Sequence, residues 1–249
     1  MKRLLGGLGL AVVGFLVLLV VEGIVARRGE VEAFTGPSTA PRSFGEDGPE
    51  LTYVVIGDST GAGQGAPYER GVAVGSARHL AAAGRRRRVT LINFAISGST
   101  MSDVLAEQSA QAARARPDVV LVAAGANDVT HLTRIGAVTR DLERIAARLR
   151  AASPGVQIVL TASPDVGAAR RLAQPLRWVA GLRTKQLNRA IAEVAESQEL
   201  TLAPIAARTG PLFAEDPTLF ASDRFHPDAR GYATWVPVIG DALDRALRR

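Results

Sequence analysis

Cysteine is absent from this chain of 249 residues, and histidine and lysine are scarce. Without cysteine the protein has no disulfide bond, no thiolate zinc site and no cysteine nucleophile. The only histidines, His79, His131 and His226, lie far apart in the sequence. A zinc site would have to combine these histidines with carboxylates, so we expect no catalytic metal.

Acidic residues are outnumbered, and the formal net charge of +6 comes almost entirely from arginine, since Lys2 and Lys185 are the only lysines. The one basic run, residues 85–88, follows Gly84 and is read as a solvated loop after a helix. Contact with anionic lipid headgroups is the alternative for this run. Nucleic-acid binding is not expected, because no aromatic residues accompany the run.

The N-terminus carries a long apolar stretch. Lys2 and Arg3 precede Leu4–Ala26, which is interrupted only by Glu22. This stretch is long enough to cross a bilayer as a helix, so residues 1–28 are predicted to be a membrane anchor. The length favours an uncleaved single-pass anchor at the cell membrane. The catalytic domain is expected to be extracytoplasmic. Cleavage of a signal peptide and secretion are the alternative, because Ile24-Val25-Ala26 offers small residues near a potential cleavage site.

Residues 29–48 contain Pro37 and Pro41, end just before Pro49 and show little apolar periodicity, so they are predicted to be a linker to one domain over residues 49–249. Within that domain, short β-rich runs alternate with amphipathic stretches. The predicted strands span residues 51–56, 89–94, 119–123, 156–161 and 200–203, and the predicted helices span residues 69–83, 101–115, 134–152, 181–198 and 228–248. This alternation predicts a three-layer α/β/α fold with a five-stranded parallel, flavodoxin-like sheet.

The connection over residues 163–181 is unusually long and contains Pro164, Pro175 and Trp178. Long loops after strands of such sheets tend to form lids or substrate walls. Ligands of open parallel sheets bind outside the carboxyl ends of the strands, which is where this loop and the polar clusters below are expected.

Ser59 follows the first predicted strand in a turn with Gly57 and Gly61 on either side. Such a turn can present the hydroxyl at the end of the strand, which is where a nucleophile is needed. The alternative is that Asp58 and Ser59 only cap the following helix.

Two further turns offer hydrogen-bond donors. Asn127 follows the third predicted strand after Gly125, and Gly98 follows the second. The Asn127 amide and the Gly98 backbone N–H can both stabilise a developing oxyanion. Here too, capping turns are the alternative.

Near the C-terminus, Asp223 precedes His226 by three residues, and Pro227 follows directly. At this spacing the carboxylate can hold the imidazole in one tautomer while the other ring nitrogen faces a hydroxyl. An acid partner and a proline-stiffened turn make a purely structural role for His226 less ordinary.

Together these residues resemble the four sequence blocks of the SGNH hydrolases, also called the GDSL esterase/lipase family. The resemblance covers roughly residues 51–247 and rests on Gly57-Asp58-Ser59, Gly98, Gly125-x-Asn127-Asp128 and Asp223-x-x-His226. It implies that Ser59 is the nucleophile, that His226 is the base oriented by Asp223, and that Gly98, Asn127 and the Ser59 amide form the oxyanion hole. Asp58 and Asp128 would support these groups.

One residue departs from the family pattern, because Thr60 stands where the name-giving leucine is expected. This change affects the shape of the acyl pocket more than the chemistry. The predicted function is a cofactor-independent serine esterase acting on carboxylic esters of lipid or acetylated-glycan type. A catalytically silent, membrane-tethered domain that binds a glycan or lipid is the alternative.

Other folds fit the same residues less well. Gly57-x-Ser59-x-Gly61 matches the nucleophile elbow of α/β-hydrolases, but several strands precede that elbow and only one precedes Ser59. The glycines at 61, 63 and 65 are not followed by the Gly-Lys-Ser/Thr of a phosphate loop. A receiver domain would need a lysine after the last strand, where none occurs.

Overall fold

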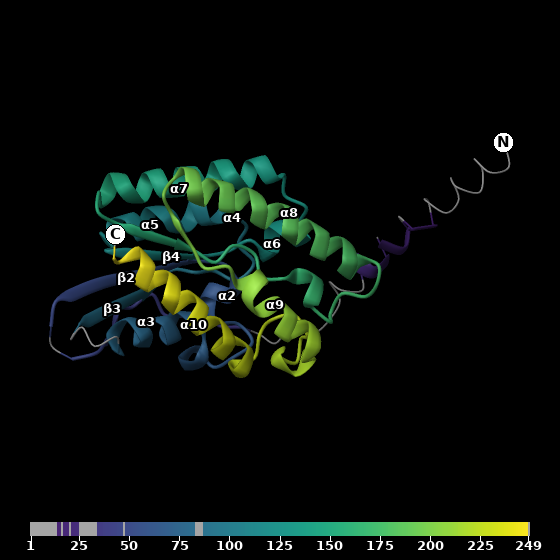
Figure 1. Ribbon diagram of the computed structural model, residues 1–249, viewed down its shortest axis with the longest axis horizontal. Coiled ribbons are helices and arrows are strands. Elements are labelled where there is room, and N and C mark those ends of the chain that lie inside the picture. The colour runs from purple at the N-terminus through teal and green to yellow at the C-terminus, as the bar shows by residue number, and fades with distance from the viewer. Residues whose placement is uncertain are drawn as a thin grey trace.

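The computed structural model describes residues 14–15, 17–19, 21–24, 34–46, 48–82 and 87–248. These residues build a six-stranded sheet in the order β1-β3-β2-β4-β5-β6 (Figure 1). The strands are β1 (Arg42–Phe44), β2 (Glu50–Gly57), β3 (Arg88–Asn93), β4 (Val119–Ala123), β5 (Gln157–Leu160) and β6 (Thr201–Leu202). β2 to β6 are parallel in the flavodoxin-like order, but β1 runs antiparallel to β3. The prediction of a five-stranded, wholly parallel sheet is therefore wrong in its count and at this edge.

The added strand lies within the predicted linker, residues 29–48. Arg42 holds it to the domain through an ion pair with Glu69 at 2.7 Å. The Arg42 guanidinium also stacks over Phe44 and Tyr68, at 5.5 and 5.6 Å from the ring centroids. A three-residue strand fixed by such distant contacts carries no alternating pattern that the sequence could reveal.

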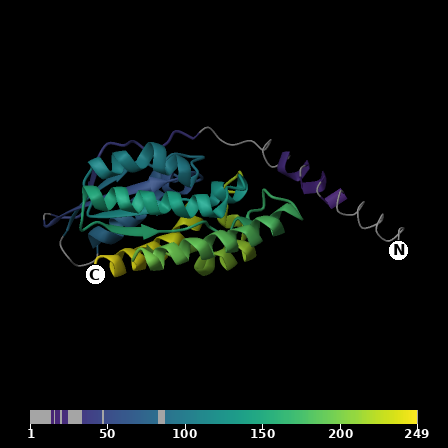
Figure 2. The same cartoon turned by 90° about the horizontal axis from the view of Figure 1, so that it is seen from above.

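Helices cover both faces of the sheet, because alternate residues of the buried strands point to opposite sides. Val54 and Ile56 pack with the helices of one layer, and Tyr53 and Val55 pack with those of the other. The first layer holds α5 (Ser109–Arg114), α7 (Ile135–Ala152) and α8 (Leu176–Ser197), and the second holds α3 (Val72–Ala82), α9 (Ile205–Glu215) and α10 (Ala229–Ala246). Figure 1 shows the two layers on either side of the sheet, and Figure 2 looks down on the layer that holds α7 and α8.

Three helical predictions differ from the structure. The predicted helix over residues 101–115 is divided into α4 (Met101–Asp103), a π-helical turn η2 (Val104–Gln108) and α5. α8 begins at Leu176, inside the predicted loop 163–181, and α9 was not predicted. Two short helices, α2 (Ser59–Ala62) and α6 (Ala126–Thr130), follow β2 and β4 at the carboxyl edge of the sheet.

The described residues at 14–15, 17–19 and 21–24 are helical. The predicted membrane segment, residues 4–26, lies in part outside the described residues. Within the described ranges, no helix combines the length and the apolar character needed to cross a membrane. The described part of this segment contacts the domain, because Glu22 Oε2 accepts a hydrogen bond from the Leu176 backbone N–H at 2.9 Å.

Candidate active site

Ser59 is the first residue of α2, directly after the end of β2. Its neighbour Asp58 caps this helix, accepting hydrogen bonds at Oδ1 from the Thr60 backbone N–H at 2.9 Å and from the Thr60 hydroxyl at 2.7 Å. Asp58 therefore does the capping, and the Ser59 hydroxyl stays available. The turn requires glycine at 57, where φ is +146° and a Cβ atom would lie 1.9 Å from the carbonyl oxygen of Ala123.

Ser59, His226 and Asp223 form a continuous hydrogen-bonded chain. His226 Nε2 lies 2.9 Å from Ser59 Oγ, and His226 Nδ1 lies 2.5 Å from Asp223 Oδ2. The serine and histidine are buried, and they are 167 residues apart in sequence. This is the arrangement of a nucleophile, a base and an orienting acid.

The carboxylate of Asp223 stabilises the loop that carries both Asp223 and His226. Asp223 Oδ1 accepts the backbone N–H groups of Phe225 and His226, each at 2.9 Å. An antiparallel bridge between Phe220 and Pro227 closes the base of the loop. Gly65, with φ +97°, lets the chain after α2 approach this loop, because a Cβ atom there would lie 2.8 Å from that of His226.

Hydrogen bonding sets the charge of Asp223. Burial on its own would raise the pKa of this carboxyl, but the hydrogen bonds from the His226 ring and from the two backbone N–H groups lower it to about 2. Asp223 is therefore ionised at neutral pH. In contrast, burial raises the pKa of Asp58 and of Asp128 above the ordinary value, only partly offset by their hydrogen bonds.

The predicted oxyanion donors follow the two strands that flank β2, Gly98 after β3 and Asn127 after β4. Asn127, in α6, donates one Nδ2–H to the carbonyl oxygen of Ser99 at 3.0 Å, which joins α6 to the turn containing Gly98. A side-chain amide has two N–H donors, so the second remains for a ligand. Gly98 has φ +88°. Asp128 also links the two segments, since its Oδ2 accepts the Met101 backbone N–H at 3.0 Å.

Gln108 is a site residue that the sequence analysis missed. It is fully buried, and its side-chain amide pairs with both backbone groups of Gly57, accepting the N–H at 2.7 Å and donating to the C=O at 2.9 Å. The same amide nitrogen donates to Ser99 Oγ at 3.0 Å. Gln108 thus ties the end of the nucleophile strand to the oxyanion turn. It projects from the π-helical turn, and such turns often occur at functional sites.

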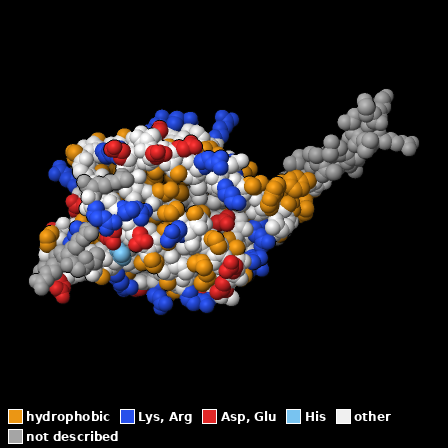
Figure 3. Space-filling model, viewed as in Figure 1, with side chains coloured by type: hydrophobic (Ala, Val, Ile, Leu, Met, Phe, Trp, Pro, Cys, Tyr) orange, Lys and Arg blue, Asp and Glu red, His pale blue; other side chains and the backbone are white. Residues whose placement is uncertain are grey.

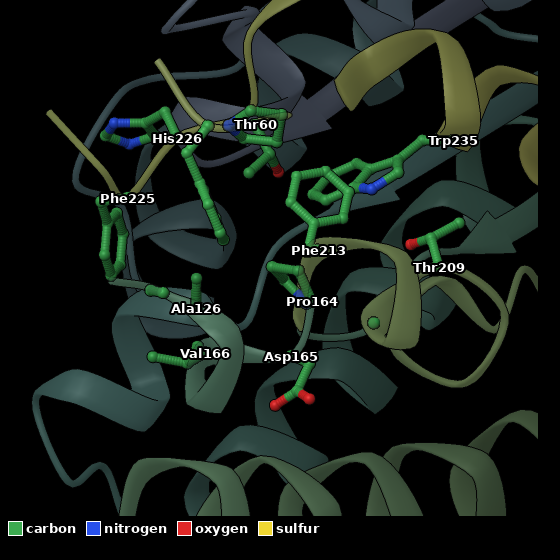
Figure 4. A pocket seen from close by; sticks show the side chains of 14 residues that line it. Thr60, Ala126, Pro164, Asp165, Val166, Thr209, Phe213, Phe225, His226 and Trp235 are labelled. Atoms are coloured by element: carbon green, nitrogen blue, oxygen red, sulfur yellow. The ribbon is translucent and has the colours of Figure 1, made fainter. Parts of the chain in front are cut away.

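A cavity lies beside the nucleophile, between Thr60 and His226 at one end and Phe213 and Trp235 at the other (Figure 4). Its volume is about 30 Å³, which is room for about two water molecules. Most of the lining is apolar. At the far end, the Trp235 indole N–H is buried and has no hydrogen-bond partner among the described residues.

The remaining histidines lie outside this cluster. His131 is exposed, and His79 Nε2 lies 3.1 Å from Asp244 Oδ2, an ion-pair geometry between α3 and α10. Within the described ranges, no group of three or more His, Asp or Glu side chains is placed to hold a metal ion.

Comparison with known proteins agrees with this geometry. The model of the GDSL-like Lipase/Acylhydrolase family matches residues 55–234. A GDSL-like esterase of Mycobacterium tuberculosis is 31% identical over 257 aligned positions, which cover 98% of this chain and 81% of the relative.

Solved structures share the fold at lower identity. A lipase from a goat rumen metagenome superposes with a TM-score of 0.63 at 20% identity, covering 77% of this chain and 97% of the other. An acetylxylan esterase from Geobacillus stearothermophilus gives 0.55 at 21% identity, covering 80% and 95%. A phospholipase A1 from Streptomyces albidoflavus gives 0.56 at 20% identity, covering 77% and 99%. With the family match spanning most of its length, the chain belongs to the GDSL-like lipase/acylhydrolase family.

Proposed function

We propose that this family member is a serine esterase that works through an acyl-enzyme, with Ser59 as nucleophile, His226 as general base and Asp223 as the orienting acid. The chain is a carboxylic ester hydrolase by family, and what is proposed is the role of each residue. The observation that carries the assignment is the unbroken chain of hydrogen bonds from Asp223 through His226 to Ser59.

In the first step, His226 Nε2 takes the proton of the Ser59 hydroxyl as Oγ attacks the ester carbonyl carbon. Ionised Asp223 stabilises the imidazolium that forms. The Ser59 and Gly98 backbone N–H groups and the free Nδ2–H of Asn127 donate to the oxyanion. His226 then gives its proton to the leaving alkoxide, which departs as the alcohol.

In the second step, His226 takes a proton from water as the water oxygen attacks the acyl-enzyme carbonyl. Collapse of this tetrahedral intermediate returns the proton to Ser59 Oγ and releases the carboxylic acid. No cofactor takes part in either step.

The cavity beside Thr60 is proposed to receive the acyl chain. Room for about two water molecules corresponds to about two carbons beyond the carbonyl. Short acyl groups, acetyl and propionyl, should therefore be preferred over long chains. The relatives' names span an acetylxylan esterase and a phospholipase A1, so the fold does not choose between glycan and lipid alcohols.

The N-terminal apolar stretch is proposed to anchor the chain in the cell membrane, with the catalytic domain outside the cytoplasm. The support is the length of residues 4–26 and their basic flanks. Protease treatment of intact cells checks this orientation: the domain should be cut without lysis, and full protection until lysis would contradict it.

Turnover of p-nitrophenyl esters by the parent and by Ser59→Ala tests the catalytic assignment. Loss of the nucleophile should lower kcat by about 10⁶-fold. In an acyl-length series, kcat/KM should fall beyond propionate. Near-equal turnover of Ser59→Ala and the parent would overturn the assignment, while a flat acyl series would overturn only the role of the cavity.

A further inference from the structure

Exposed large hydrophobic side chains of the catalytic domain gather at one end of the sheet. Among the described residues after the N-terminal helical segment, five such side chains are exposed, and each lies in the connection or helix that follows the carboxyl end of a strand. They are Ile96 after β3, Leu132 after β4, Trp178 and Leu182 after β5, and Leu212 after β6. This is also the end that holds the active site. Trp178 and Leu132 are 59% and 66% exposed, so neither belongs to the core.

Basic side chains surround part of this surface. Trp178 and Leu182, one turn apart on α8, line a hollow of about 310 Å³ together with Arg170, Arg177 and Lys185. None of these three cations forms an ion pair within the described part of the chain, and Asp165 is the one acidic residue in the lining. Tryptophan next to arginine and lysine is typical of protein surfaces at the membrane interface.

The N-terminal helical segment leaves the domain from the same place. Glu22 accepts the hydrogen bond from Leu176 N–H at the first residue of α8, two residues before Trp178. Phe15, Val17, Leu18 and Val21 of this segment are exposed. Figure 3 shows the hydrophobic side chains at this junction with lysine and arginine side chains beside them.

From these three observations we propose that the carboxyl end of the sheet docks on an anionic bilayer surface, with Trp178 and Leu182 at headgroup depth and Arg170, Arg177 and Lys185 contacting lipid phosphates. The active site then opens toward the bilayer. If the site opens toward the bilayer, the substrate class is an ester held at the membrane surface, an inference that rests on the proposed esterase function. The apolar segment leaving from this face favours a bilayer over a soluble partner.

Fluorescence of the full-length chain in nanodiscs tests the docking, because the chain has only two tryptophans. In Trp235→Phe, Trp178 is the single indole. With brominated phosphatidylcholine and phosphatidylglycerol as the lipids, docking predicts a blue-shifted emission and loss of about half of its intensity. The matched variant Trp178→Phe retains the buried Trp235 and should be quenched little.

Charge reversal provides the second arm. Arg177→Glu with Lys185→Glu should reduce the quenching of Trp178 at least by about half, since each basic residue near the surface favours anionic lipid. Arg114→Glu with Arg248→Glu changes the net charge equally and should not reduce the quenching. Both residues are exposed, Arg114 at the end of α5 before β4 and Arg248 after α10.

Water-like emission from Trp178 in nanodisc-bound protein, or an equal effect of both charge pairs, would overturn the docking. Neither readout uses ester hydrolysis, so a failed docking result and a failed catalytic assignment can be told apart.

Discussion

The two sides of the active site are built differently. On one side, Ser59, His226 and Asp223 are joined directly, side chain to side chain, at 2.9 and 2.5 Å. On the other, the oxyanion donors are placed indirectly: Asn127 is tied to the carbonyl of Ser99, and Gln108 ties Ser99 to the backbone of Gly57. The proton-relay side is therefore assembled before substrate arrives, while the oxyanion side depends on Gln108, a buried amide that does not contact the substrate.

The difference predicts unequal sensitivity to substitution. Removing a member of the directly bonded side eliminates a chemical function, and removing Asn127 eliminates one donor, whereas altering Gln108 behind the oxyanion turn only shifts the position of a donor. The substitutions below test this contrast, from the largest expected effect to the smallest.

After Ser59→Ala, Asp223→Asn should have the largest effect. The amide removes the charge that stabilises the His226 imidazolium and favours the wrong ring tautomer, so kcat should fall by about 10⁴-fold. Steady-state kinetics on p-nitrophenyl acetate measures this. Asp228→Asn is the matched control, because Asp228 caps α10 in the adjacent turn and asparagine caps about equally well. Equal losses in both variants would contradict the special role of Asp223.

Asn127→Ala should lower kcat by about 10² to 10³-fold, the effect of losing one oxyanion donor. KM should change little, because the donor acts mainly on the transition state. A rise in KM with unchanged kcat would instead place Asn127 in ground-state binding.

Gln108→Met should lower kcat by about 10- to 100-fold by letting the oxyanion turn shift relative to Ser59. It also leaves the Gly57 N–H unpaired, while the Gly57 C=O keeps only the hydrogen bond from the Ile96 backbone N–H. Tm should therefore fall, and kinetics must be measured well below it. Gln111→Met, on the same helical stretch, is the control and should retain activity.

A double variant separates positioning from simple destabilisation. If Gln108 acts through the oxyanion turn, its substitution should cost less when Asn127→Ala is already present. Additive losses in kcat would refute a shared role.

The smallest effect concerns stability against pH. The pKa of Asp223, about 2 in the folded protein, lies below its ordinary value of 3.8, so its ionised form stabilises the fold above pH 3.8 and this contribution disappears as pH falls through about 2. The free energy of unfolding, measured with urea, should therefore be higher for the parent than for Asp223→Asn at pH 5, and this difference should narrow toward pH 2. Asp241→Asn is the control, and its free energy of unfolding should change with pH about as that of the parent does. A gap independent of pH would contradict the low pKa.

The sequence marked each residue of the directly bonded side, and on the indirect side it marked Gly98 and Asn127 but missed Gln108. A motif at the end of the first parallel strand marked Ser59, and a motif in the last loop marked Asp223 and His226. The five parallel strands lie within two residues of their predicted bounds, because buried β-branched runs leave a local signal. Gln108 left none. A glutamine inside an apparently amphipathic helix reads as a surface residue, and only tertiary packing turns it toward Gly57.

The other misses have the same cause. β1 is held by Arg42 reaching Glu69 and Tyr68, contacts that no local pattern encodes. α9 contains Gly210 and Pro211, which argue against a helix, yet Phe213 packs into the core beside Trp235. The start of α8 at Leu176 follows Pro175 within a stretch that reads as loop.

The most direct test of the account is the site of covalent reaction with a fluorophosphonate, followed by intact mass and peptide mapping. The account predicts one adduct, on Ser59, formed rapidly by the parent, slowly by Asp223→Asn and not at all by Ser59→Ala. An adduct on another residue, or no adduct with folded parent protein, would contradict it.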